Sequence, residues 1–319
     1  IVLDGLNAEY LSHYSRTDWK PNAGWLTGAT DSGIILRGKD HVVRDSVISY
    51  SAGNGINTIG TNFTISNNVI HDINYSGTDG AAVNTLFAGS PNSGHVITDN
   101  TVFNTGRSGI RITGLKYGTV THNTIYNFGL QTCDNGGIYA YNSDGTGTVI
   151  AYNTIRDGLN VVPGFMLAGI YLDEGSKNYT IHHNLVYNVG HALTLNGPSS
   201  NQKVYNNTFL GAMKGINTLP GRTFPGTVLK NNIFQGTMPL MPGATFSSNL
   251  INDPQVKFVN VAANDYRLAP GSKGINTGLI ILGITNGFIG VLPDIGALEY
   301  NDNFWGSGSS FAATPNSPT

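Results

Sequence analysis

The stretch His122-Asn123-Thr124-Ile125 returns 30 residues later as Tyr152-Asn153-Thr154-Ile155, and both copies belong to a longer series. An asparagine anchors seven copies, and Ser46 anchors an earlier, degenerate one. The asparagines are Asn68, Asn100, Asn123, Asn153, Asn184, Asn207 and Asn232. From Ser46 onward the steps are 22, 32, 23, 30, 31, 23 and 25 residues. A basic period of 22–25 residues with three longer steps indicates a solenoid whose coils carry loop insertions.

Short strand-like segments lie between the anchors. Segments 109–113, 137–141, 169–173 and 192–196 each begin with a small residue, and their second and fourth positions are apolar or small. This period-two alternation predicts strands with one buried face. Leucine-rich repeats share the period, but this chain lacks their Leu-rich consensus and their helical segments. The sequence therefore predicts an all-β fold, a right-handed single-stranded parallel β-helix of about ten coils with an internal ladder of stacked asparagines.

Composition limits the classes of function. Of the 319 residues, 11% are charged and 39% are hydrophobic, and the formal net charge is −2 without a basic tract. These values give no sign of a nucleic-acid partner or of binding to an anionic membrane. No apolar run approaches the ~18–20 residues of a membrane span, and the single Cys133 excludes an intramolecular disulfide. The low charge and the Asn/Gly/Thr/Ser-rich composition fit a secreted, extracellular bacterial protein, which we expect to be a monomer.

The repeats suggest one elongated domain over residues 1–305. Residues 1–30 lack clear alternation and are expected to cap the first coil, because a solenoid end exposes unpaired strand edges. The repeat weakens after about Phe234, so residues 235–305 are expected to form closing coils. Residues 306–319, rich in Ser, Pro, Ala and Thr, read as a linker or tail. The abrupt start at Ile1 suggests a processed or trimmed N-terminus.

Outward positions of the central strands predict a binding surface. Because neighbouring coils stack ~4.8 Å apart, Arg111, Tyr139 and Tyr171 should lie in one line on one exposed face. Asn57 and Asn84 extend that line, and Tyr141, Asp173 and Asn196 form the line beside it. Loop insertions at 74–80, 130–136 and 160–166 are expected to form its walls. Tyrosine rings stack on sugar rings and amides pair with hydroxyls, so the groove suits a polysaccharide.

The chain ending adds a family resemblance. Segments 265–272, 274–278 and 293–300 resemble the C-terminal closure of many bacterial β-helix proteins related to pectate lyases. The resemblance covers nearly the whole chain through its repeats. It is specific for the fold, and it implies no single activity.

The first functional hypothesis is β-elimination on an acidic polysaccharide, a uronic-acid polymer with alginate as first choice. Arg111 with Asn84 would neutralise the sugar carboxylate, and Tyr139 or Tyr171 would serve as base and acid. His191 and Lys116 are reserve bases. The arrangement resembles β-helix alginate lyases, where Arg, Lys and Tyr do this work.

Metal dependence is a separate question. The calcium-dependent pectate lyases would need a cluster of groove carboxylates, and only Asp134, Asp173 and Glu174 are available. No cofactor is therefore predicted, although the three acids leave calcium possible. No spacing of His and acidic residues resembles a zinc site.

Two other hypotheses stay open. Asp134 and Asp173 could act as the two carboxylates of a glycoside hydrolase, with Glu174 as a spare. A β-helix module that binds glycans without cleaving them is the third possibility. C5-epimerases use a similar groove, but no Tyr-Gly-Phe/Ile-Asp-Pro-His-like signature occurs in the chain.

Overall fold

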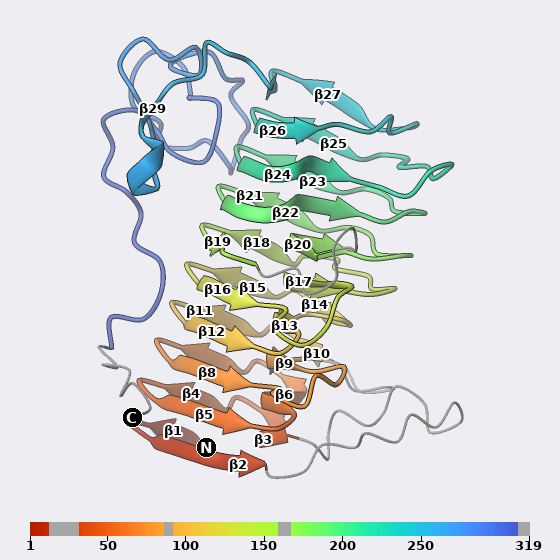
Figure 1. The fold of residues 1–319 in the computed structure, drawn as a ribbon, viewed down its shortest axis with the longest axis vertical. Helices are drawn as coiled ribbons and strands as arrows, with labels where there is room; N and C mark the ends of the chain where they lie inside the picture. The colour runs from red at the N-terminus through yellow and green to blue at the C-terminus, as the bar shows by residue number, and fades with distance from the viewer. Residues whose placement is uncertain (13–31, 86–91, 159–166, 312–319) are drawn as a thin grey trace.

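The computed structural model describes residues 1–12, 32–85, 92–158 and 167–311. Its coils stack in chain order, from β1 and β2 at one end to β27 at the other (Figure 1). Every pairing between coils is parallel, and the long sheets confirm the predicted right-handed parallel β-helix. The first sheet holds ten strands, one for each coil, which agrees with the expected number of coils.

The first sheet consists of short strands that precede the asparagine turns. They are β1 (Val2–Asp4), β4 (Val42–Arg44), β7 (Thr64–Ser66), β11 (Val96–Thr98), β15 (Thr119–Thr121), β18 (Val149–Ala151), β21 (Thr180–His182), β23 (Lys203–Tyr205), β25 (Val228–Lys230) and β27 (Thr245–Ser247).

The second sheet contains two rows of strands. The row after the asparagine turns contains β2 (Asn7–Ser12), β5 (Val47–Ser51), β8 (Val69–Ile73), β12 (Thr101–Thr105), β16 (Thr124–Phe128), β19 (Thr154–Arg156), β22 (Leu185–Leu195), β24 (Thr208–Asn217), β26 (Ile233–Thr237) and β28 (Leu250–Ile251). The other row contains β3 (Ser32–Lys39), β6 (Asn54–Thr61), β9 (Ala81–Asn84), β13 (Ser108–Arg111), β17 (Asn135–Ala140) and β20 (Leu167–Leu172), with the short β10 (Asn92–Ser93) and β14 (Leu115–Lys116) near it. Strands β22 and β24 are long enough to belong to both rows.

The asparagine ladder forms as predicted. The Asn123 amide donates to the Asn153 side-chain oxygen at 3.0 Å, and Asn153 donates to Asn184 at 2.9 Å. These side chains are fully buried, and each also donates to one backbone carbonyl of its own turn and to one of the preceding coil. The residue before each ladder position adopts a left-handed conformation, such as His122 with φ 54° and Tyr152 with φ 56°. The two-residue corner therefore turns the chain, and the ladder satisfies its polar groups.

Two contacts extend the ladder beyond the predicted series. Asn232 donates to Asn249 at 2.8 Å, so one more asparagine follows after a step of only 17 residues. At the other end, the Ser46 backbone N–H donates to the Asn68 side chain at 3.2 Å.

Strands β13 and β17 each carry a glycine near their start, at a position with no room for a side chain. A Cβ on Gly109 would lie 2.6 Å from Ile125, and one on Gly137 would lie 2.5 Å from Ile155. The core residues of the second sheet fill this corner and belong to one hydrophobic cluster that runs through the stack. Tight packing at this corner fixes where each strand of the second row starts.

The chain ends differ from the sequence expectation. Residues 1–12 form β1 and β2, the strands of the first coil, and the rest of the expected cap lies outside the described residues. The last strand that stacks on the coils is β28, so residues 253–305 are not closing coils. They lie beside the stack and include the antiparallel pair β29 (Phe258–Asn260) and β30 (Asp265–Leu268), joined by the 3-10 turn η2 (Val261–Ala263) (Figure 1).

The reason for this side packing is an apolar patch on the outside of the second sheet. Leu185, Leu210 and Ile233 point outward from β22, β24 and β26, where a closed coil cannot cover them. Leu268 and Ile295 of the C-terminal segment pack against them and bury all five side chains. Removing this surface from water stabilises the segment in its position.

The expected linker also contacts the β-helix over its described part. The Gly308 N–H donates to the His122 carbonyl at 2.7 Å, and the Ser309 N–H donates to the Thr101 hydroxyl at 2.8 Å. Ser310 reaches Asn67 near the N-terminal coils. Residues 306–311 therefore run back along the stack. None of the helices in the described residues is long and apolar enough to cross a membrane.

Candidate active site

Strands β13, β17 and β20 place Arg111, Tyr139 and Tyr171 in adjacent register. The expectation of an exposed strip is wrong, however, because these side chains are only 2%, 4% and 0% exposed. The tyrosine rings meet edge to face with centroids 5.3 Å apart, and the Arg111 guanidinium lies 5.5 Å from the Tyr139 ring centroid. The three residues therefore form a buried polar cluster.

Two charged residues that the sequence analysis did not select complete this cluster. Asp79, from the loop before β9, binds Arg111 at 2.8 Å and lies 3.3 Å from the Arg107 guanidinium. Burial alone would raise the pKa of Asp79, but the two guanidinium groups outweigh burial and lower it. The Asn74 side chain shapes this loop: its amide N–H donates to the Thr78 carbonyl, and its oxygen accepts from the Thr78 N–H.

Each tyrosine donates its hydroxyl to an aspartate. Tyr139 donates to Asp173 at 2.9 Å, and Tyr171 donates to Asp134 at 3.3 Å. Burial, followed by the nearby carboxylates, raises the pKa of both phenols well above the usual range. A phenol that holds its proton this firmly is a poor base, which weakens the role expected for both tyrosines in elimination.

The two aspartates occupy different environments. Asp173 is buried and accepts hydrogen bonds from Tyr139, from the Asn196 amide at 2.7 Å and from the Glu174 N–H at 2.7 Å. These three hydrogen bonds hold both carboxyl oxygens of Asp173 in place.

Asp134 lies at the start of β17 and is half-buried, with a left-handed backbone (φ 58°) that directs it away from the strand. Burial and the negative charge of Asp173 raise its pKa, although the Arg107 charge opposes them. Tyr171 lies within hydrogen-bonding reach of both carboxylates. The site thus pairs a hydrogen-bonded carboxylate, Asp173, with a neighbouring carboxyl group, Asp134, whose pKa is raised.

The remaining predicted residues divide into those beside the cluster and those away from it. Asn57 and Asn84 continue the line of Arg111 and are fully buried, and Tyr141 packs against the tyrosine pair. Glu174 pairs with Arg222 at 3.2 Å. Lys116 is exposed and pairs with Asp144 at 3.3 Å in a turn, so no contact among the described residues joins it to the cluster.

His191 lies in β22, one coil further along the stack than Tyr171, and is paired in register with Ala168 and Lys214. Burial and the Lys214 charge lower its pKa to about 4, so it is neutral at pH 7. Its Nδ1 atom is buried without a hydrogen-bond partner in the described part of the chain. His191 therefore places a neutral ring next to Ala168, which packs against the tyrosine pair.

The outer edge of the cluster is where a ligand can approach. Asp79 and Arg107 keep 32% and 19% of their side chains exposed. Asp79 belongs to the first insertion and the half-buried Asp134 to the second. The third insertion, 160–166, lies outside the described residues. Over residues 1–12, 32–85, 92–158 and 167–311, no group of three or more His, Cys, Asp or Glu is arranged to hold a metal ion.

Comparison with known proteins supports the fold class. A family model described as a right handed beta helix region matches residues 85–234, which include the cluster except for Asp79. Together with the stacked parallel coils, this match makes the chain a right-handed parallel β-helix protein.

Solved structures resemble the chain at low sequence identity. The pectate lyase Pel9A matches with a TM-score of 0.53 and 16% identity, covering 94% of this chain and 87% of that one. XylC in complex with xylose matches with a TM-score of 0.51 and 15% identity, covering 68% and 43%. The periplasmic alginate epimerase AlgG gives 0.48 and 17%, covering 67% and 51%. No curated protein sequence matches the chain. At this level of sequence identity, the similarity shows a shared fold.

Proposed function

We propose that this protein is a polysaccharide-cleaving enzyme that hydrolyses glycosidic bonds with Asp134 and Asp173. The observation that carries the proposal is the pair of aspartates on either side of the Tyr171 hydroxyl: Asp173 accepts three hydrogen bonds, and burial and the Asp173 charge raise the pKa of Asp134. Glycoside hydrolysis uses two carboxyl groups, one as an acid and one as a carboxylate.

In the proposed reaction, the Asp134 carboxyl group donates its proton to the glycosidic oxygen as the bond to the anomeric carbon breaks. The Asp173 carboxylate, held by Tyr139 and Asn196, stabilises the positive charge that develops on the sugar. Water adds to the anomeric carbon, and its proton restores the acid for the next turnover.

The charges around the cluster favour a neutral polysaccharide over an acidic one. Arg107 and Arg111 both face Asp79, and Arg107 also donates to the Asp134 carbonyl at 3.0 Å. With Asp134 protonated, the Asp79 and Asp173 carboxylates balance the two arginines, so the site has little positive charge to spare for a sugar carboxylate. The names of the structural neighbours, a pectate lyase and a protein solved with xylose, support a polysaccharide or its units as the ligand class.

Release of reducing ends from a panel of neutral and acidic polysaccharides tests this proposal. Asp134→Asn and Asp173→Asn should each lower kcat by ~10²–10⁴-fold, because each removes one of the two groups that act on the bond. Asp302→Asn, which changes an exposed aspartate near the chain end, is the matched control and should keep full activity. Full activity in both site variants would refute the assignment.

Elimination from a uronic-acid polymer is the second candidate, and one observation favours it. The Arg107 and Arg111 guanidinium groups lie 6.0 and 5.5 Å from the Tyr139 ring centroid, and cations beside a phenol assist its ionisation. Elimination forms an unsaturated product that absorbs in the ultraviolet, whereas hydrolysis releases reducing ends without that absorbance.

Tyr139→Phe separates the two candidates by rate. For hydrolysis we expect a loss of about 10–100-fold, because the variant removes one hydrogen bond to the Asp173 carboxylate. For elimination with Tyr139 as base, activity should fall to background. Tyr117→Phe, at an exposed tyrosine outside the cluster, serves as control.

A further inference from the structure

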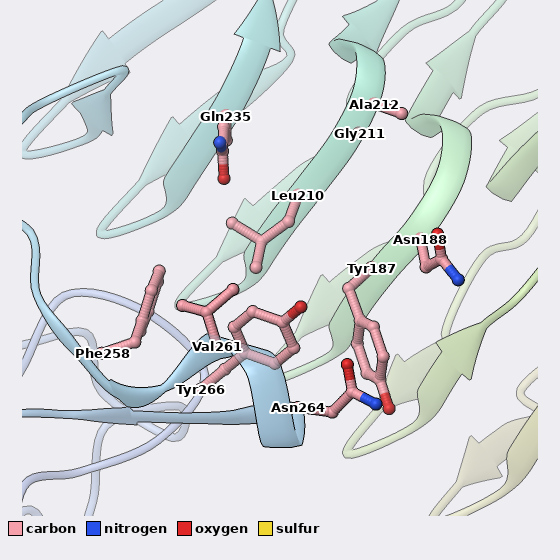
Figure 2. Close-up of a pocket in the computed structure, with 10 residues that line it drawn as sticks. All are labelled: Tyr187, Asn188, Leu210, Gly211, Ala212, Gln235, Phe258, Val261, Asn264 and Tyr266. Carbon is pink, nitrogen blue, oxygen red and sulfur yellow. The ribbon is translucent and has the colours of Figure 1, made fainter.

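A separate cavity lies on the outside of the second sheet, between strands β22, β24 and β26 and the C-terminal hairpin of β29, η2 and β30 (Figure 2). Its volume is about 350 Å³. That size lies at the lower end of the range of small-molecule sites, about 300–1,000 Å³. The hairpin packs over the apolar patch of the sheet without filling the space beside it, and this leaves the cavity open to a ligand.

Three aromatic rings form the apolar wall of this cavity. Tyr187 of β22 and Tyr266 of β30 lie with ring centroids 4.8 Å apart, and Phe258 of β29 meets Tyr266 edge to face at 5.5 Å. Leu210 of β24 lies behind them. These rings come from two parts of the chain about 70 residues apart in sequence, and only the side packing of the C-terminal segment brings them together.

Three carboxamides line the same cavity. Asn188, Gln235 and Asn264 are exposed, and Figure 2 shows the Asn264 side chain beside the Tyr187 ring. Asn188 donates to Asp157, whereas the side chains of Gln235 and Asn264 make no hydrogen bond within the described residues. None of the residues that line the cavity is Asp, Glu, Lys, Arg or His.

We propose that this cavity is a second carbohydrate site, which binds one or two units of an uncharged sugar chain without cleaving it. The apolar face of a pyranose packs on aromatic rings, and the carboxamides donate to and accept from its hydroxyls. A charged ligand would lose its hydration without gaining an ionic partner.

The site is independent of the proposed catalytic residues. Tyr187 lies near the start of β22 and Thr194, in register with Tyr171, lies near its end, so the two sites are on the order of 20 Å apart along the strand. The proposal goes beyond hydrolysis, and it would stand if the enzyme cleaved by another mechanism. In the intact protein the second site would hold a long chain to the surface while the cluster acts on it.

Ligand-observed NMR with the full chain tests the proposal. The probes are xylohexaose, cellohexaose and mannohexaose as neutral chains, and hexagalacturonate as the acidic one. The Asp134→Asn background prevents cleavage during the measurement. We expect saturation transfer to at least one neutral chain, and a loss of at least tenfold in affinity at the cavity for Tyr266→Ala and for Val261→Trp, which places a large ring at its exposed edge.

Tyr117→Ala is the control, since it removes an exposed tyrosine elsewhere on the surface and should leave binding unchanged. Gln235→Ala keeps the hairpin contacts and should weaken binding even if Tyr266→Ala disturbs the fold. In a chain that keeps Asp134, the variants Tyr266→Ala, Val261→Trp and Gln235→Ala should all cleave a short soluble substrate at the normal rate. Binding that is the same in all cavity variants, binding of the acidic chain alone, or no binding of any neutral chain would overturn the proposal.

Discussion

Glu299 is a carboxylic acid whose surroundings favour its neutral form. Burial, followed by the charge of Asp294, raises its pKa to about 7 against a backbone hydrogen bond that lowers it. One carboxyl oxygen accepts from the Asp294 N–H at 3.0 Å, and the other is buried without a partner among the described residues. A proton on that second oxygen removes an uncompensated buried charge.

The pH dependence of stability follows from this shift. The ordinary pKa of the group is 4.5, so the unfolded chain ionises first as the pH rises. The contribution of Glu299 is therefore fully present below pH 4.5 and is lost as the pH rises towards about 7. We predict that Glu299→Gln raises Tm at pH 8 relative to wild type and has little effect at pH 4.5, as measured by calorimetry. Glu9→Gln, at an exposed glutamate, should leave the Tm difference between the two pH values unchanged.

The candidate active site shows which of its residues could be predicted from the sequence. Alternation and the repeat register predicted that Arg111, Tyr139 and Tyr171 would be neighbours, because strand pairing follows the repeat. Asp79 and Arg107 were missed because they lie in loops, where no periodicity fixes the direction of a side chain. A search for charges in the quoted insertion 74–80 would have found Asp79. The burial of the cluster also escaped prediction, since partner residues from loops determine it.

The corner between the first and second sheets is the element that repeats most faithfully. Each ladder asparagine bonds to the next coil twice, once through its backbone N–H and once through its amide, as Asn123 does to the Asn153 oxygen. The same Asn153 amide donates to the Val120 and Ala151 carbonyls. Loss of one ladder residue therefore leaves several buried groups of two coils without partners.

We predict that Asn153→Ala lowers the free energy of unfolding by about 1–3 kcal/mol for the unpaired groups. Urea unfolding followed by circular dichroism measures the change. Gln131→Ala, which removes an exposed carboxamide from a loop, is the control and should stay within about 0.5 kcal/mol of wild type. A midpoint for Asn153→Ala equal to that of Gln131→Ala would show that the ladder does not stabilise the fold.

Elements outside the repeat were harder to predict. Asn249 follows Asn232 by 17 residues because the coil that joins them carries only short strands, and a search for steps of 22 or more misses it. The C-terminal segment was expected to form closing coils because the repeat weakens gradually after Phe234 and the ending resembles the closure of other β-helix proteins. Its position beside the stack depends on outward Leu and Ile residues of distant strands, and alternation within the segment does not reveal that contact.

At the scale of the whole molecule, the C-terminal segment links coils that are far apart in the stack. Trp305 packs edge to face against His122 and Tyr152, with centroids 6.4 and 5.7 Å away, and Ser307 contacts Thr124 and Thr154. Further along, Ser309 and Ser310 reach Asn67. Coils of a solenoid otherwise contact only their neighbours, so these bonds add long-range coupling to the fold.

We predict that removal of residues 306–319 lowers stability by about 2 kcal/mol, given the several hydrogen bonds lost. In a domain of this size that corresponds to a fall in Tm of about 3 °C. Removal of 312–319 alone keeps the described contacts and is the matched control. A truncation at 306 that melts with the control would show that these contacts are not stabilising.

The same segment has a consequence for how the protein is made. A parallel β-helix can wind coil by coil as the chain leaves the ribosome, since each coil needs only the one before it. The residues that contact His122, Thr101 and Asn67 are synthesised later, roughly 185 to 240 positions after their partners. Until then the outer surface of these coils remains uncovered. Residues 306–311 therefore bind only to coils that have already formed, and a chain that stops before them leaves that surface open to other molecules.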